Sequence, residues 1–399
     1  MKKAPEILTS HEKFHINLGL ERISKILALL DNPQDNYKVI HIAGTNGKGS
    51  TSKIINEILI KKGVKTGLFT SPHLFSYEER IRINNEKISS YLFDKLTNKI
   101  DSLAKENNIE LSEFELITAV GFYYFYLKQV EYVVLEVGLG GKFDATNVVK
   151  NSTCVVTTID FDHTERLGSN IEEIALQKAG IIKENSNLIV SKENKGYKTI
   201  KKIAKEKNAK LIKIPDVKIE YSDKNYAIVD NKKYEFNLLG SHQAQNLALA
   251  LGAINSLDLS FDDETIKEAL KNVKWRFRLE YIKEKNILID AGHNPSGIKT
   301  LADFIEENFK NTKKIYIFGC LKNKAYQEML DILNPKENEL YFFEFNYPNA
   351  LKYDELDEKY QAKKISSLKE IQEIIETNKD LKVFCGSIYM LGKTFKDIF

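Results

Sequence analysis

The sequence predicts an α/β protein with a mostly parallel sheet and a phosphate-binding loop in its first domain, followed by a smaller α/β domain. Short apolar, strand-like runs alternate with helix-like segments along most of the chain. A glycine-rich turn carrying Lys48 follows the first of these runs, and a new alternation begins after Trp275. At 399 residues the chain is too long for one ordinary hydrophobic core. We therefore expect two domains, at residues 1–274 and 275–399.

Apolar runs and amphipathic periodicity place the individual elements. In the first domain the expected strands are Lys38–Ala43, Thr66–Thr70, Tyr132–Val137, Cys154–Ile159, Leu188–Val190 and Lys210–Ile214. The expected helices are Ser52–Lys62, Tyr91–Lys105, Phe114–Leu127, His242–Ser256 and Asp263–Asn272. Residues 217–239 alternate around polar turns at 223–225 and 230–233, which predicts antiparallel hairpins. In the second domain, strands are expected near Leu279–Asp290, Lys314–Phe318, Glu339–Phe345 and Lys382–Phe384.

Composition and charge indicate a globular protein without a nucleic-acid or membrane partner. Hydrophobic residues make up 42% and charged residues 29% of the chain, and its 59 basic and 56 acidic residues nearly cancel. The three cysteines are far apart and lack metal-ligand spacing, which favours buried thiols in a reducing compartment. Neither a signal peptide nor an apolar stretch of membrane-spanning length is recognisable. We expect a cytoplasmic protein.

The glycine-rich turn Gly44-Thr45-Asn46-Gly47-Lys48-Gly49-Ser50-Thr51 has the layout of a phosphate cradle. Backbone N–H groups and a helix N-terminus would face an anion, Lys48 would neutralise charge, and Ser50 or Thr51 could hold Mg²⁺. The spacing is unusual, because Gly49 stands between the lysine and the hydroxyl. Ile42 stands where the common pattern has its outer glycine. The alternative is an ordinary Asn-Gly turn between a strand and a helix.

Polar clusters follow three further expected strands. They are Thr70–Leu74 with Glu79-Arg80 beyond it, Glu136–Gly141 with Asp144–Asn147 beyond it, and Thr158–Thr164. Each cluster taken alone also fits a turn, a flexible loop or a helix cap. Because the carboxyl ends of parallel strands meet at one edge of a sheet, we expect these clusters to lie near the phosphate cradle. Mg²⁺ prefers oxygen ligands, so Glu136 is the stronger metal ligand and His163 the less usual one.

Together these motifs resemble the folylpolyglutamate synthase/dihydrofolate synthase family of Mur-type ligases. Four more segments extend the resemblance over nearly the whole chain: Leu18–Ile23, Gln177–Ile181, His242–Asn246 and Asp290–Pro295. The resemblance implies a P-loop-containing Mur ligase central domain followed by a smaller Rossmann-like domain. The chain departs from the family at Trp275-Arg276-Phe277-Arg278, where Trp-Pro-Gly-Arg is frequent, and at Asn323, where an aspartate is usual.

The resemblance also implies a role for each site residue. The nucleotide would be held by Gly47, Lys48, Gly49, Ser50, Thr51, Asn246, Arg278, Asp290 and His293. Metal ions would be held by Ser50, Ser71, Glu136 and His163. Lys178 would be modified to a carbamate that supplies anionic oxygens, and it would act in catalysis with Lys48 and His163; the alternative is a solvated helix lysine. The pterin pocket would be lined by Leu18, Gly19, Leu20, Glu21, Ser112, Glu113, Phe114, Glu115, Phe143, Asp144 and Ala145. Phe114 and Phe143 would flank a flat ring or belong to the core.

The implied activity is ATP-driven ligation of L-glutamate to a pterin or folate carboxylate through an acyl phosphate. The substrates would be dihydropteroate or a reduced folate, L-glutamate and ATP, and the enzyme would be a monomer. Mg²⁺ would occupy two sites, with a monovalent cation as an additional candidate. One alternative is a cell-wall Mur ligase, but those enzymes carry an additional domain before the phosphate loop, and the residues before Gly44 are too few to form one. A nucleotide-dependent switch or an inactive homologue is a further alternative, against which the acidic and histidine-bearing strand ends argue.

Overall fold

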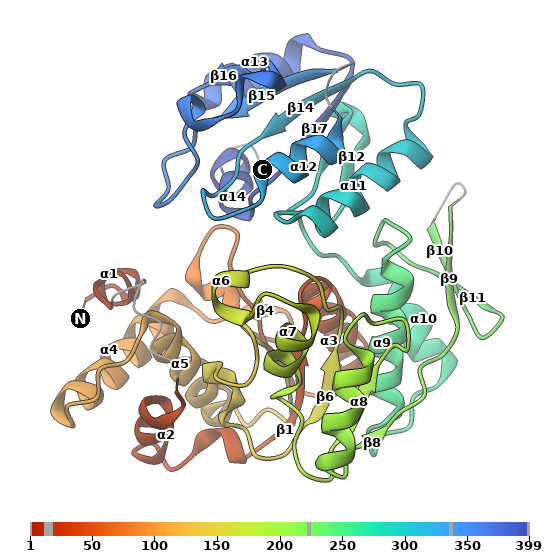
Figure 1. Cartoon of the computed structure of the whole chain (residues 1–399). Coiled ribbons are helices and arrows are strands. Elements are labelled where there is room, and N and C mark those ends of the chain that lie inside the picture. The colour runs from red at the N-terminus through yellow and green to blue at the C-terminus, as the bar shows by residue number, and fades with distance from the viewer. Residues whose placement is uncertain (1, 12–18, 222–224, 335–337, 397–399) are drawn as a thin grey trace. The chain divides into compact units, whose positions relative to one another are not determined.

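The computed structural model describes residues 2–11, 19–221, 225–334 and 338–396 (Figure 1). The chain divides into two compact units. The first is built from Met1–Glu220, Tyr226–Phe236 and Ala244–Val273, and the second from Tyr221–Asn225, Asn237–Gln243 and Lys274–Phe399.

The main sheet of the first unit has eight strands within the described residues, in the order β4-β3-β2-β5-β1-β6-β7-β8. Their bounds are β1 Lys38–Ala43, β2 Thr66–Phe69, β3 Ile81–Ile83, β4 Glu86–Lys87, β5 Tyr132–Glu136, β6 Thr153–Val156, β7 Asn187–Val190 and β8 Lys210–Leu211. Strands β2, β5, β1, β6, β7 and β8 run parallel, whereas β3 and β4 form an antiparallel margin. The carboxyl ends of the parallel strands therefore share one edge of the sheet.

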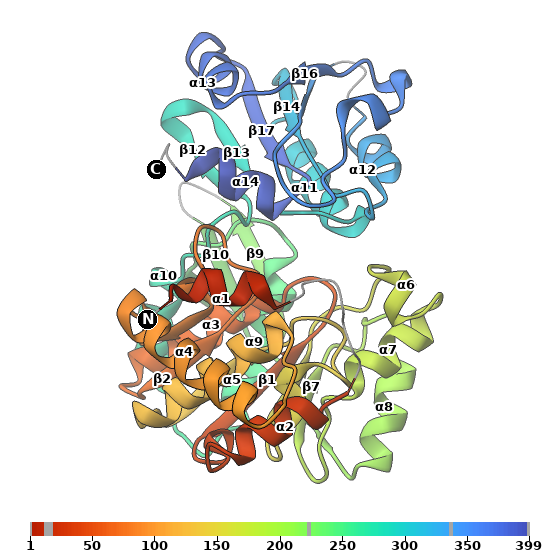
Figure 2. The ribbon, with the colours of Figure 1, turned by 90° about the vertical axis from the view of Figure 1, so that its left-hand side faces the viewer.

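Helices cover both faces of this sheet. Their bounds are α1 Ala4–Ser10, α2 Glu21–Ala28, α3 Lys48–Lys61, α4 Ser90–Glu106, α5 Glu113–Leu127, α6 Thr164–Leu167, α7 Ile171–Ala179, α8 Tyr197–Glu206, α9 Gln243–Asn255 and α10 Asp263–Asn272. Helices α2, α4, α5, α7 and α8 lie along one face (Figure 2). Apolar side chains of α2, α4 and α5 pack there over β1, β2 and β5, and those of α7 and α8 over β6 and β7. On the other face, α3 contacts β2 and β5 and packs against α10.

A three-stranded sheet joins β9 Val217–Tyr221, β10 Asn225–Val229 and β11 Lys232–Glu235. The hairpin predicted around 230–233 is confirmed, because β10 and β11 pair in antiparallel fashion. Asp230 and Asn231 between them both have positive φ angles, as tight hairpin turns require. The other predicted turn includes residues 223 and 224, which lie outside the described residues.

The second unit contains a sheet of six strands among its described residues, in the order β12-β13-β17-β14-β15-β16. The strands are β12 Glu280–Ile282, β13 Ile287–Ile289, β14 Lys314–Phe318, β15 Glu339–Phe343, β16 Lys363–Ile365 and β17 Leu381–Cys385. The helices are α11 Pro295–Asn308, α12 Tyr326–Leu333, α13 Leu368–Thr377 and α14 Ile388–Phe395. All neighbours pair in parallel except β12 and β13.

The single strand expected over Leu279–Asp290 is wrong. A short 3-10 helix at Lys283–Lys285 ends at Asn286, which has a φ of 51°, and this turn separates β12 from β13. The other 3-10 helices described are Pro33–Asp35, Tyr77–Arg80, Ala145–Val148, Tyr353–Glu355 and Glu358–Tyr360.

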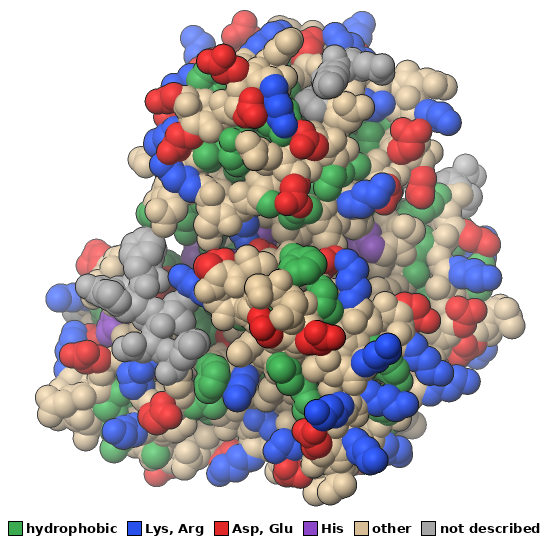
Figure 3. Space-filling model, viewed as in Figure 1, with side chains coloured by type: hydrophobic (Ala, Val, Ile, Leu, Met, Phe, Trp, Pro, Cys, Tyr) green, Lys and Arg blue, Asp and Glu red, His purple; other side chains and the backbone are tan. Residues whose placement is uncertain are grey.

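Basic and acidic side chains are interspersed over the surface shown in Figure 3, in keeping with the near balance of their numbers. Among the described residues, none of the helices is both long enough and apolar enough to cross a membrane. The predicted α/β class is confirmed in both units.

Candidate active site

The phosphate loop connects the end of β1 to helix α3. Gly47 has a φ of 84°, and a Cβ atom there would lie 2.3 Å from Oδ1 of Asn246 in α9. Only glycine therefore fits this position. The left-handed turn at Gly47 starts the helix at Lys48, four residues earlier than the sequence predicts. The N-terminus of α3, with the buried Ser50 and Thr51 in its first turn, thus lies directly at the loop.

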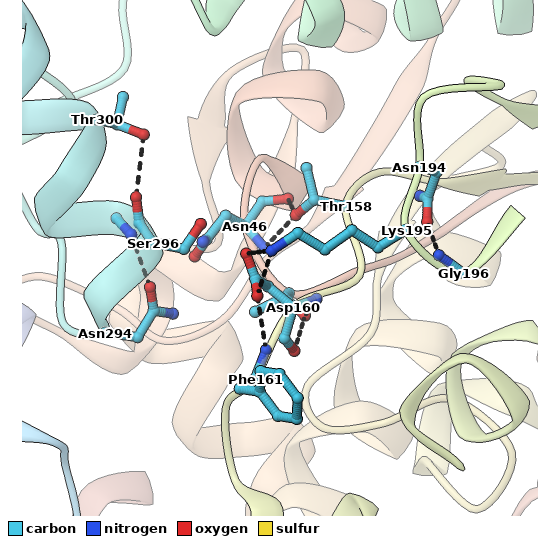
Figure 4. Close-up of polar contacts among 12 residues, drawn as sticks. Asn46, Thr158, Asp160, Phe161, Asn194, Lys195, Gly196, Asn294, Ser296 and Thr300 are labelled. Atoms are coloured by element: carbon cyan, nitrogen blue, oxygen red, sulfur yellow. Dashed lines mark hydrogen bonds and ion pairs between the residues drawn. The ribbon is translucent and has the colours of Figure 1, made fainter. Parts of the chain in front are cut away.

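Hydrogen bonds from the segment after β6 brace the phosphate loop (Figure 4). The backbone N–H of Asn46 donates to Oγ1 of Thr158 over 2.9 Å, and the N–H of Thr45 donates to the carbonyl of the same residue over 2.7 Å. Thr45 Oγ1 donates to the carbonyl of Asp160, whose carboxylate lies 2.9 Å from Lys195 Nζ through both oxygens. The loop is therefore held in shape by its neighbour in the sheet.

Two lysines converge on the carbonyl oxygen of Gly44. Lys48 Nζ donates to it over 3.1 Å and Lys178 Nζ over 2.9 Å. Lys178 is only 4% exposed, so the alternative of a solvated helix lysine is wrong. The pKa of Lys178 is lowered to about 7, chiefly by burial and also by the charge of Lys48, while the charge of Asp162 opposes the shift. A buried amine with such a pKa is partly neutral at pH 7 and can act as a nucleophile.

Ser71 and Glu136 are brought together at the ends of β2 and β5. The backbone N–H of Ser71 donates to Oε2 of Glu136 over 3.2 Å, and Glu136 is buried. Among the described residues, no three His, Cys, Asp or Glu side chains form a group that could hold a metal on their own. One carboxylate with nearby hydroxyls fits Mg²⁺, which commonly takes one or two carboxylates and completes its shell with water and substrate phosphates.

His163 lies after β6, at the start of the short helix α6. Its φ of 50° places it in the left-handed region, and its ring is 31% exposed. The ring nitrogens lie 3.8 Å from a carboxylate oxygen of Asp162 and 3.7 Å from one of Glu165. The ring is thus accessible beside two acidic groups.

In the expected pterin pocket, the segment at 112–115 contacts Arg22, which directly follows the segment at 18–21. Arg22, next to Glu21, forms an ion pair with the buried Glu115, and Ser112 caps α5 through a reciprocal bond with Glu115. Tyr77 donates its hydroxyl proton to Glu113 over 2.5 Å. Gly19 and Leu20 precede α2 directly, whereas Leu18 lies outside the described residues.

Phe114 and Phe143 differ in their surroundings. The Phe114 ring packs edge-on against Phe69, and a Cβ atom on Gly138 would lie 2.5 Å from it. This contact joins the start of α5 to the loop that follows β5. Phe143 is 38% exposed, and Lys142 Nζ lies 5.0 Å from its ring centre.

Asp144 is fully engaged inside the loop after β5. Its carboxylate accepts the backbone N–H of Leu139 over 2.8 Å, the N–H of Thr146 over 3.0 Å and the Thr146 hydroxyl over 2.5 Å. Burial raises the pKa of Asp144, and the hydrogen bonds from Thr146 oppose this. Ala145 is buried next to it. The hydrogen bonds of Asp144 therefore hold the conformation of the loop after β5.

In the second unit, Asp290 stands at the end of β13 and organises two turns. Its carboxylate accepts the N–H groups of Leu279 over 2.9 Å and Gly292 over 2.7 Å. Burial raises the pKa of Asp290, and the charge of Arg278 opposes this. His293 follows at the start of α11, with Nδ1 3.0 Å from the carbonyl of Ala291. Arg278, Asp290 and His293 therefore lie close together within this unit.

Sequence reasoning assigns no role to Gly44 or His242. Gly44 stands out only once the chain is folded, because its carbonyl accepts from both lysines. His242 is half-buried near Arg278, and desolvation, followed by the charge of Arg278, lowers its pKa to about 4. The segment His242–Asn246, which carries part of the family resemblance, is the sequence feature that could have singled out His242.

Comparisons with known proteins identify the family and the fold of the chain. Residues 42–254 match the Mur ligase middle domain, and residues 277–388 match the Mur ligase glutamate ligase domain. The dihydrofolate synthase/folylpolyglutamate synthase of Bacillus subtilis is 32% identical over 412 aligned residues, which cover 95% of each protein.

Solved structures agree over the whole chain. Escherichia coli FolC in complex with DHPP and ADP has a TM-score of 0.88 at 26% identity, covering 100% of this chain and 98% of that one. A bifunctional folylpolyglutamate synthase/dihydrofolate synthase with Mn, AMPPNP and L-glutamate bound has a TM-score of 0.87 at 26% identity, covering 100% and 98%.

The α/β fold with a phosphate loop at a strand end and a second α/β unit is that of a Mur-type ligase. The middle-domain match extends over more than half of the chain and places the chain in this class. Within it, the chain belongs to the dihydrofolate synthase/folylpolyglutamate synthase family.

Proposed function

We propose that this chain ligates L-glutamate to the carboxylate of a pterin or folate, with conversion of ATP to ADP and phosphate. The observation that carries the proposal is the convergence of Lys48 and Lys178 on Gly44, at the start of a helix and on the same sheet edge as the Ser71–Glu136 pair. An anionic triphosphate is the substrate that the Lys48 ammonium and the N–H groups at the start of α3 suit best.

The reaction would proceed in two steps. An oxygen of the acceptor carboxylate attacks the γ-phosphorus of ATP, forming an acyl phosphate and releasing ADP. The α-amine of L-glutamate then attacks the acyl carbon, an amide bond forms, inorganic phosphate leaves, and the amine loses a proton. No covalent protein nucleophile is needed, so the contribution of the protein is positional and electrostatic. Lys48 and the N–H groups of residues 47–51 would hold the phosphates, and Asn246, Arg278, Asp290 and His293 would contact the rest of the nucleotide.

The oxygen-rich strand ends fit Mg²⁺. Ser50 would hold one ion together with the phosphates, and Ser71, Glu136 and His163 would provide a second site. When bound, Mg²⁺ would offset the negative charge of the phosphates. A monovalent cation is a further candidate, and replacing potassium with a bulky organic cation in the assay would test it.

Lys178 would carry a carbamate. The ammonium group first loses a proton. The neutral amine then attacks carbon dioxide, a C–N bond forms and a second proton is released, so an anion replaces the original cation. This change is favourable beside Lys48, because the repulsion between two ammonium groups is replaced by attraction. The pKa of about 7 supports a neutral amine at working pH.

The pterin pocket would be formed by residues 18–21, 112–115 and 143–145. Residues 114 and 115 contact Gly138, in the loop that leads to residue 143, and Arg22, which follows residue 21; these contacts support one pocket. We propose dihydropteroate and reduced folates as alternative acceptors of one bifunctional enzyme, which acts as a cytoplasmic monomer. A nucleotide-dependent switch and a cell-wall ligase are not favoured, because the relatives named above match almost the full chain.

Acceptor-dependent ADP release tests the proposal. ADP should form only when ATP, L-glutamate and a pterin acceptor are all present, and a comparison of dihydropteroate with tetrahydrofolate measures each half of the bifunctional activity. Hydrolysis of ATP that ignores both L-glutamate and the acceptor would contradict ligation. Turnover with dihydropteroate alone would restrict the enzyme to dihydrofolate synthesis.

A further inference from the structure

We propose that Asn147 is a positioning residue that holds Lys178 at the phosphate loop by fixing the end of helix α7. The sequence segment Asp144–Asn147 belongs to one of the polar clusters that follow a strand, but Asn147 itself has no assigned role in binding a nucleotide, metal or pterin. The inference rests on the role proposed above for Lys178.

Asn147 connects the loop after β5 to the end of α7. Its Nδ2 donates to the carbonyls of Lys142 over 3.0 Å and Gly180 over 3.1 Å. Its Oδ1 accepts from Lys183 Nζ over 2.8 Å, and its backbone carbonyl accepts from the same amine over 2.9 Å. The residue is only 7% exposed. Both amide hydrogens are therefore used, and the side chain has one orientation that satisfies them.

The loop lies directly against the last turn of α7. Lys142 N–H donates to the carbonyl of Gln177 over 2.8 Å. A Cβ atom on Gly141 would lie 2.8 Å from that carbonyl oxygen and 2.9 Å from that of Lys178. The last carbonyls of a helix have no partner within it, and here the loop supplies donors for them. The position of the helix end is thus set by the loop.

The same turn carries Lys178, two residues before Gly180. The Lys178 amine reaches Gly44 over 2.9 Å while the residue is almost fully buried, so a small displacement of the turn would move the amine off its target. The other end of this network reaches the strand that leads into the phosphate loop. Thr146 Oγ1 lies 2.9 Å from Nε2 of His41 in β1. Residues 146 and 147 therefore tie β1 and α7 to one loop.

A matched control exists at the opposite end of the same helix. Asn170 caps α7 by accepting the N–H of Glu173 over 2.9 Å, two turns from Lys178. Asn147→Ala and Asn170→Ala both remove an asparagine that satisfies a helix end. Only the first removes the contact next to Lys178, so the pair separates positioning from general helix stability.

The experiment combines steady-state kinetics, thermal melting and carbon-13 NMR in labelled bicarbonate, all on the full chain. In Asn147→Ala we expect kcat to fall by about tenfold to a hundredfold, the KM for ATP to change by less than about twofold, and the Lys178 carbamate signal to weaken. In Asn170→Ala we expect a lower melting temperature with kcat and the carbamate signal unchanged. Equal losses of kcat in both variants would mean that only helix stability matters, and would overturn the proposal.

Lys183→Met provides a second variant if Asn147→Ala does not fold. It removes the two bonds from Lys183 Nζ to Asn147 and leaves both Nδ2 bonds in place. We therefore expect a smaller loss of kcat, about threefold or more, at constant KM. An unchanged kcat would overturn the positioning role. A wild-type protein without a carbamate signal would instead contradict the role proposed for Lys178, whereas a wild-type signal that persists with full kcat in Asn147→Ala would contradict only the inference.

Discussion

The position of Lys48 in the phosphate loop predicts that its replacement lowers the catalytic rate. Because its ammonium lies at the helix start and over two loop carbonyls, it can follow a transferring phosphoryl group with little reorganisation. We expect Lys48→Met to reduce kcat by about a hundredfold to a thousandfold. Lys61→Met is the control, because Lys61 is an exposed side chain at the far end of the same helix. Near-normal turnover in Lys48→Met would remove this lysine from the catalytic machinery.

The lowered pKa of Lys178 and its proposed carbamate predict that activity depends on bicarbonate and on pH. Its pKa of about 7 means that the neutral amine becomes predominant as the pH rises through neutrality. At constant dissolved carbon dioxide, the carbamate fraction and kcat should therefore rise between about pH 6 and about pH 8. Activity should fall in carbon dioxide-depleted buffer and return when bicarbonate is added, whereas Lys178→Gln should have low activity that bicarbonate does not restore. A wild-type rate that is indifferent to bicarbonate at both pH values would argue against the modification.

At the scale of elements, the buried parallel strands could be predicted because both of their faces are covered, so their sequences are continuous apolar runs. Strands β1 and β14 have the predicted bounds. Strand β16 could not be found in this way, since Lys-Lys-Ile at the sheet edge has no apolar run. The early start of α3 depends on the left-handed turn at Gly47, and the division of β12 from β13 on Asn286, which are backbone conformations rather than hydrophobic patterns.

The residues of the candidate site also differ in whether the sequence alone could predict their positions. Lys48, Ser71 and Glu136 could be placed near each other because they follow parallel strands, whose ends share an edge. The burial of Lys178 could not be predicted from its own segment. In the folded chain its amine reaches the carbonyl of Gly44, which is 134 positions away in the sequence. Residue type predicts the chemistry, whereas tertiary packing decides which lysine is desolvated.

At the junction of residues 275–279, Phe277 combines an unfavourable backbone conformation with a favourably packed ring, and the free energy of unfolding shows which of the two effects is larger. Phe277 has a φ of 59°, yet its ring is fully buried, 5.6 Å from that of Phe395. Glycine would relieve about 1 kcal/mol of left-handed strain but lose about 4 kcal/mol of ring packing. We expect Phe277→Gly to destabilise the second unit by about 3 kcal/mol in urea unfolding.

Phe277→Leu is the matched variant, because it retains the backbone strain and much of the buried apolar volume. Its loss of stability should be smaller than that of Phe277→Gly. If Phe277→Gly were as stable as the wild-type protein, backbone strain would outweigh packing here, and the phenylalanine would need another explanation.

At the scale of the whole molecule, the lowered pKa values of two desolvated histidines predict that stability falls in mild acid. His242 in the second unit has a pKa of about 4 against an ordinary value of 6.5, and burial also lowers the pKa of His41 in the first unit. The unfolded chain therefore takes up protons below about pH 6.5, whereas the native His242 stays neutral until about pH 4. Its contribution is complete above pH 6.5 and is lost as the pH falls through this window, by about 3 kcal/mol in total.

His242→Gln isolates this contribution, because glutamine is polar and does not titrate. Between about pH 7 and about pH 5, we expect the free energy of unfolding of the wild-type protein to fall by about 2 kcal/mol more than that of His242→Gln, measured by urea titration at each pH. The raised pKa of the buried Asp290 acts in the opposite direction, since its protonation stabilises the native state in acid, but it is present in both proteins and cancels in the comparison. Parallel curves for the two proteins would mean that His242 takes up its proton in the native state as readily as in the unfolded chain, and so that the side chain is hydrated in solution.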